Sequence, residues 1–164
     1  MSYGEKKTIV SMVAGVLLLA AYIVYTLNAY AAGNASPADL RFSAVTMLVF
    51  IGIGVGVTIV TQIVFHILMA IGIAIRKPTA KDAEIEQQLS AETREDEMDK
   101  LIELKALQTG YYIAGTGTLC ALVSIVLGVQ NGVMLNIIYL SMALGSLAEG
   151  ALKLFYYRKG VRHA

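Results

Sequence analysis

Residues 42–75 read FSAVTMLVFIGIGVGVTIVTQIVFHILMAIGIAI, a stretch without Asp, Glu, Lys or Arg that decides the fold. As an α-helix it would be roughly 50 Å long, at about 1.5 Å per residue. The hydrocarbon core of a bilayer is only about 30 Å thick. We therefore expect a membrane helix that tilts, breaks or projects beyond the lipid. Gly52, Gly54 and Gly56 are where we expect a bend or a close contact with another helix.

Three further apolar blocks accompany this stretch, and each is long enough to span a bilayer. They cover about residues 9–32, 106–129 and 133–157. The first is longer than the apolar core of about 7–15 residues in a signal peptide, so we interpret it as a true helix. Of all residues, 57% are hydrophobic and 15% are charged, against about 25% charged in soluble domains. The sequence therefore predicts an all-α fold, a four-helix bundle embedded in the lipid bilayer as one domain over residues 1–164.

The positions of Lys and Arg predict the orientation. They gather near the N-terminus, in residues 76–105 and in the C-terminal tail, whereas Arg41 is the only one on the opposite side. Because basic residues favour the cytoplasmic side of a membrane, we expect both termini and residues 76–105 in the cytoplasm. A prokaryotic cytoplasmic (inner) membrane is the expected location.

Several functional classes have no support in the sequence. The net charge of +1 and the absence of a basic stripe exclude a typical nucleic-acid binder. Cys120 stands alone, so the chain has no internal disulfide or CxxC site. No metal-binding set, phosphate loop or catalytic motif is present. We expect no cofactor, no metal and no enzymatic activity.

Small residues at four-residue spacing mark the expected helix contacts, because they allow two backbones to approach closely within lipid. The second, third and fourth blocks contain such residues: Gly52, Gly56, Gly110, Ala114, Gly145 and Gly150. Packing within one bundle is the first interpretation. The alternative is that one of these faces forms a homodimer.

Polar side chains inside the apolar blocks are the candidate site. Glu149 and Lys153 are one helical turn apart and can form an ion pair. Counted from the basic boundary, His66 and Glu149 both lie roughly 13–15 Å into the membrane, and Gln62 is one turn from His66. A histidine beside a carboxylate suits proton exchange or cation binding. The alternative is a polar contact that only fixes the register of two helices.

The charged segment 76–105 is the only long polar stretch. Its acidic cluster is either a solvated helix face or a docking surface for a cytoplasmic protein partner; the candidate residues are Glu95, Asp96, Glu97, Asp99 and Glu103. Part of this segment resembles small uncharacterised prokaryotic four-helix membrane proteins that carry a D-E-x-D-x-x-I-x-x-K-A run. Here that run is DEMDKLIELKA, residues 96–106, and the resemblance extends over about residues 95–160. It implies a regulatory role beside a helix-turn-helix protein and transfers no catalytic residue.

Two functional hypotheses follow. The first is a small non-enzymatic membrane protein that binds a partner through residues 76–105. The second is a small oligomeric transporter or channel that uses the polar site at His66 and Glu149.

Overall fold

The computed structural model describes residues 3–76 and 97–159, and its regular elements there are all α-helices. Their bounds are Tyr3–Ala31 for α1, Leu40–Arg76 for α2, Glu97–Val126 for α4 and Asn131–Lys159 for α5. Each of the four is long and apolar enough to cross a membrane. The predicted all-helical fold with four long helices is confirmed for the described residues.

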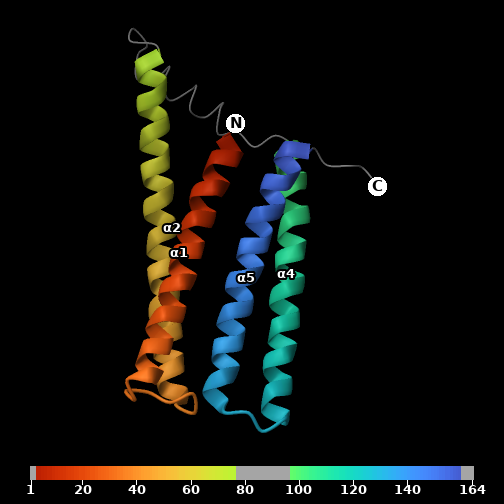
Figure 1. Cartoon of the computed structure of the whole chain (residues 1–164). Coiled ribbons are helices and arrows are strands. Elements are labelled where there is room, and N and C mark those ends of the chain that lie inside the picture. The colour runs from red at the N-terminus through yellow and green to blue at the C-terminus, as the bar shows by residue number, and fades with distance from the viewer. Residues whose placement is uncertain (1–2, 77–96, 160–164) are drawn as a thin grey trace.

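The four helices run alternately up and down (Figure 1). The start of α1, the end of α2, the start of α4 and the end of α5 lie together at what we call the terminal end. Residues 32–39 and 127–130 connect the helices at the opposite end, the loop end. Helix α2 is continuous from Leu40 to Arg76, so it does not break, which was one of the three ways expected to accommodate its length. It instead projects past the start of α1 at the terminal end.

Two glycines with positive φ end the helices at the loop end. Gly33 has φ 70° and Gly128 has φ 75°, a conformation that lacks steric strain only for glycine. After each glycine the next amide bonds back to the helix: Asn34 N–H donates to Ala29 O at 3.1 Å, and Val129 N–H donates to Ser124 O at 2.9 Å. These are Schellman caps, which satisfy the last carbonyls of α1 and α4.

The second turn therefore lies earlier than the sequence predicted. The apolar blocks of about residues 106–129 and 133–157 leave residues 130–132 for the turn between the third and fourth helices. Gly128 ends α4 at Val126, and Gly132 belongs to the first turn of α5. At Gly132 a side chain would collide with the carbonyl oxygen of Pro37, so this glycine allows the 32–39 loop to pack against α5. Helix α4 begins at Glu97, so it contains the end of the charged segment as well as the third apolar block from about residue 106.

Helices α4 and α5 form the tightest pair. A methyl group on Gly145 would lie 2.7 Å from Gly110 O, closer than real contacts allow. Ala106 and Ala121 of α4 have no exposed surface, and Gly117 lies directly against Ser141. Small side chains thus bring the two backbones together along their length, which gains dispersion contacts that larger side chains would prevent.

An aromatic cluster joins α1, α2 and α5 in the half of the bundle nearer the loop end. Tyr22, Phe50 and Tyr139 are at most 9% exposed. The ring of Tyr22 meets Phe50 edge-on with 5.3 Å between centroids, and lies 4.0 Å from the ring of Tyr139. The Tyr22 hydroxyl donates to Asn136 Oδ1 at 2.6 Å, so α1 and α5 are also linked by a hydrogen bond on the loop-end side of the rings.

Most of the large apolar side chains face outward. Leu48, Leu119 and Val126 are 67%, 65% and 87% exposed, whereas Ser43 and Thr46 are buried. A soluble protein of this size rarely exposes continuous apolar surface on this scale. The outer surface of the described helices is therefore suited to an apolar surrounding.

Candidate binding cavity

A cavity of about 610 Å³ lies between α1, α2 and α5 in the terminal half of the bundle. Its deep end is formed by Phe50 and Tyr139 of the aromatic cluster. Toward the terminal end its lining includes Lys7 and His66, which are both exposed. The cavity has room here because α2 leans away from α5 toward the terminal end (Figure 1).

Charged groups meet at the α5 wall of the cavity. The i,i+4 spacing predicted an ion pair between Glu149 and Lys153, and Lys153 Nζ lies 2.7 Å from Glu149 Oε1. Lys153 Nζ also lies 3.3 Å from Glu103 Oε1 of α4. The side chains of Lys153 and Glu149 are only 19% and 22% exposed, against 53% for Glu103. One ammonium group is thus shared by a deeper carboxylate and a more superficial one.

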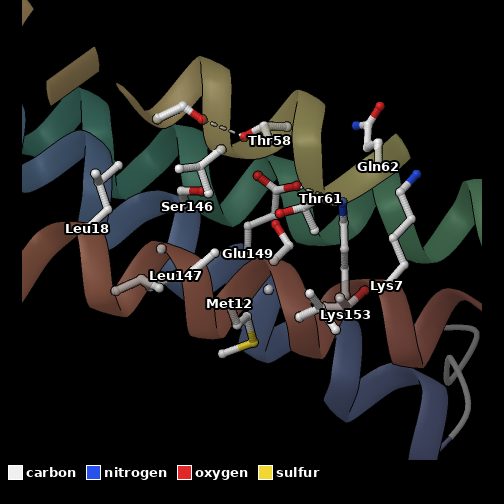
Figure 2. A pocket seen from close by; sticks show the side chains of 18 of the residues that line it. Lys7, Met12, Leu18, Thr58, Thr61, Gln62, Ser146, Leu147, Glu149 and Lys153 are labelled. Carbon is white, nitrogen blue, oxygen red and sulfur yellow. Dashed lines mark hydrogen bonds and ion pairs between the residues drawn. The ribbon is translucent and has the colours of Figure 1, made fainter. Parts of the chain in front are cut away.

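The predicted α2 residues line the same cavity. His66 and Gln62 both belong to its wall, opposite Glu149 and Lys153 of α5. Thr58 and Thr61 add hydroxyl groups, and Thr58 Oγ1 donates to Gly54 O at 2.9 Å. Figure 2 shows Glu149 and Lys153 extending from α5 into the space toward α2, near Thr61. The structure thus brings all four predicted polar residues to one cavity.

Helix α1 supplies a wall that the sequence did not predict. Lys7, Thr8 and Ser11 line the cavity from this side. We interpreted Lys7 only as a marker of orientation. Thr8 and Ser11, three residues apart in an apolar helix, were the available signal of a polar face. Figure 2 places Lys7 at the same end of the cavity as Gln62.

The glycines of α4 and α5 shape this site as well as the packing. A methyl group on Gly110 would lie 3.1 Å from Gly145 O and 3.4 Å from Glu149 Oε2. Gly110 therefore leaves the space that the Glu149 side chain occupies. Ala114 also lies at this contact, since its amide nitrogen is 3.6 Å from a methyl group placed on Gly145. Gly150 lies against Met12 of α1.

The glycines of α2 meet the expectation only in part. Gly52 and Gly56 have nothing within 4 Å of an added methyl group, so they make no close helix contact within the described chain. The contact is at Gly54, where a methyl group would lie 2.9 Å from Leu18 Cδ2. Residues two apart point to nearly opposite sides of a helix, which explains why Gly54 packs and its neighbours do not.

The acids predicted to bind a partner divide into two groups. Glu95 and Asp96 lie outside the described residues. Of the other three, Glu97 is exposed at the start of α4, whereas Asp99 and Glu103 line the cavity. Glu103 also pairs with Lys153. At least two of these acids therefore belong to the cavity rather than to a separate outer face.

The cavity offers charge pairing and hydrogen bonding rather than metal coordination. Within residues 3–76 and 97–159, no three His, Cys, Asp or Glu side chains come together in a way that would hold a metal ion. Its polar groups are carboxylates, ammonium groups, hydroxyls, an amide and an imidazole. Such a set can hold and exchange a proton or bind a charged solute.

Comparison of the chain with family models, with curated proteins and with solved structures found no match in any of the three.

Proposed function

We propose that this chain is a small transport protein of the cytoplasmic membrane that exchanges protons and a small cationic solute through the cavity. The observation that carries the proposal is the position of His66, Gln62, Glu149 and Lys153 on one cavity between apolar helices. Ionisable groups within membrane helices are costly, and they most often mark a solute or proton pathway.

Membrane insertion is supported by the outward-facing apolar side chains and by the length of each helix. The proposed orientation puts the terminal end in the cytoplasm. At that end Lys6 and Lys7 lie in the first turns of α1 and Arg158 and Lys159 end α5, whereas among the described residues Arg41 is the only Lys or Arg near the loop end. This asymmetry follows the positive-inside rule. The cavity then faces the cytoplasm, with the aromatic cluster between it and the outer side.

Residue accessibility tests whether the cavity is an aqueous compartment. Cys120 is first replaced by alanine, and single cysteines are then introduced as Thr61→Cys and Val60→Cys. Thr61 lines the cavity, whereas Val60 does not line it and is 59% exposed. A membrane-impermeant maleimide should label the Thr61→Cys protein in inside-out vesicles and should leave the Val60→Cys protein unlabelled. Equal absence of labelling at both positions would refute the proposed cavity.

Proton flux tests transport itself. Purified protein is reconstituted into liposomes that contain a pH-sensitive dye, and a pH gradient is imposed. We expect dissipation faster than in protein-free liposomes, lost in Glu149→Gln and reduced in His66→Ala. The matched control is Glu97→Gln, which removes the same charge at an exposed position outside the cavity. A wild-type rate equal to that of empty liposomes would argue against transport.

Binding of a cytoplasmic partner through residues 76–105 stays a prediction. We do not adopt it as the proposed function, because Asp99 and Glu103 line the cavity. Co-purification from membranes with and without residues 82–94 tests it directly. Loss of a specific partner on deletion, with proton flux intact, would support a regulatory role for the segment.

A further inference from the structure

We infer that the ligand of the cavity is a lipophilic organic cation, and that Lys153 is a tethered counter-ion which the ligand displaces from Glu149. The inference rests on the proposed function and names its solute class. It also assigns Glu103 a specific part, the carboxylate that keeps Lys153 paired while Glu149 is occupied.

The balance of charge in the cavity favours a cation. Three carboxylates line it, those of Asp99, Glu103 and Glu149, against the two ammonium groups of Lys7 and Lys153. Lys153 Nζ is within ion-pair distance of both Glu103 and Glu149, so these three side chains together carry one more negative charge than positive charge when ionised. Electrostatic attraction is stronger in a partly buried site than in water. The cavity therefore favours a cationic ligand over a neutral or anionic one.

The shape and chemistry of the cavity favour an organic ligand rather than a bare ion. Its volume of about 610 Å³ falls within the range of about 300–1,000 Å³ that is typical of small-molecule sites. The apolar end is lined by Leu18, Leu19, Phe50 and Tyr139, while the carboxylates lie toward the terminal end. Aromatic side chains contact apolar groups well and also attract cations through their ring faces. A molecule with apolar groups and a positive charge fits both ends.

The position of Lys153 explains how Glu149 becomes available. If Lys153 had Glu149 as its sole partner, a ligand that took this carboxylate would leave a partly buried ammonium group unpaired, which is unfavourable. Glu103 Oε1 lies 3.3 Å from the same nitrogen, so a small movement keeps Lys153 paired. The longer and more exposed contact to Glu103 is the position that Lys153 takes when the ligand is bound.

Tetraphenylphosphonium is the probe for the test. It is a permanent, lipophilic cation without a hydrogen-bond donor, and its binding to the detergent-solubilised full chain is measured by equilibrium dialysis. We expect saturable binding that weakens about tenfold or more in Glu149→Gln, because the electrostatic attraction between the carboxylate and the cation is lost. Glu149→Asp should retain part of the affinity. Glu97→Gln, which removes an equal charge outside the cavity, should bind like the wild type.

Two further variants test the role of Lys153. Lys153→Gln should bind the probe several-fold more tightly, because the internal competitor is gone. Glu103→Gln should bind it more weakly, because Lys153 is then held by Glu149 alone. If Glu103 acts through Lys153, the effects of the two substitutions on probe affinity are not additive. Glu103→Gln should then weaken probe binding much less in the Lys153→Gln protein than in the wild-type chain.

The outcomes separate this inference from the proposed function. Labelling of Thr61→Cys together with no saturable probe binding would overturn the ligand class and leave the aqueous cavity intact. Weaker binding in Lys153→Gln would overturn the counter-ion role, as would additive effects of the two substitutions. Each variant is checked for the wild-type helical circular dichroism and elution volume, and one that fails is replaced by the matching charge-neutral methionine or alanine variant.

Discussion

Gly145 of α5 lies directly against the carbonyl oxygen of Gly110 in α4, so near that a single methyl group would approach it to 2.7 Å. The obstructing atom belongs to the backbone and cannot move aside as a flexible side chain would. Replacing Gly145 by alanine should therefore separate the two helices and lower the free energy of unfolding by about 1–3 kcal/mol.

The matched control is Gly115→Ala in α4, where nothing lies within 4 Å of the added methyl group. Alanine is a better helix former than glycine by about 1 kcal/mol, so this variant should be as stable as the wild type or more stable. Unfolding in detergent, followed by circular dichroism, measures both. If Gly145→Ala proved as stable as Gly115→Ala, the close contact between α4 and α5 would be wrong.

A second prediction concerns the three alternating glycines of α2. Gly54→Ile should destabilise the chain, because the larger side chain must displace Leu18 of α1. Gly52→Ile and Gly56→Ile should leave the stability of the monomer unchanged, since both positions face open space. The melting temperature in detergent compares the three variants, which carry the same substitution in the same helix. A lower melting temperature for Gly52→Ile or Gly56→Ile, together with a shift from dimer to monomer, would instead place the face of α2 that carries Gly52 and Gly56 in a homodimer.

These glycines also define what could be predicted from the sequence. The length of the uncharged apolar blocks was sufficient to predict four helices. Unpaired backbone groups are costly in lipid, so a chain that crosses it has few alternatives to a helix. The small-residue rule found Gly110, Gly145 and Gly150 correctly as contact positions. It had no means to choose between Gly52 and Gly54, since the choice depends on which face of α2 meets α1, and the whole helix is apolar.

The candidate site was also predictable only in part, because sequence spacing indicates contacts within one helix but not contacts between helices. Counting residues from the helix ends placed His66 and Glu149 at one depth, and spacing paired Glu149 with Lys153. The contact between Lys153 and Glu103 joins residues that are 50 positions apart, and no local pattern indicates it. The α1 wall of the cavity was not predicted, because the positive charge of Lys7 was already explained by its role in setting the orientation of the chain in the membrane.

A third prediction concerns the hydrogen bond between α1 and α5. Tyr22 is 2% exposed, and its hydroxyl donates to Asn136 Oδ1 at 2.6 Å. Tyr22→Phe removes the donor and keeps the ring in the aromatic cluster, so unfolding should become easier by about 0.5–1.5 kcal/mol. Tyr25→Phe is the control, since that side chain is 52% exposed, and it should change stability by less. Indistinguishable stabilities for the two variants would contradict a role for this bond.

The last prediction uses the asymmetry of the charged group around Lys153. In Glu149→Gln the ammonium group keeps Glu103 as its partner, so the loss of stability should be small. In Lys153→Met two carboxylates remain at the cavity wall without the cation that both contact. Removing the shared partner of a buried pair costs about 3–5 kcal/mol. Because these side chains are partly exposed, water screens the remaining charges, and we expect about 1–3 kcal/mol instead.

Lys159→Met controls for the loss of a positive charge, since Lys159 is exposed at the end of α5. The three free energies of unfolding should rank with Lys153→Met as the least stable, followed by Glu149→Gln, with Lys159→Met closest to the wild type. Raising the salt concentration should narrow the gap between Lys153→Met and Glu149→Gln, because salt screens repulsion between exposed carboxylates. The reverse order would mean that Glu149, and not Lys153, is the common partner on which this wall of the cavity depends.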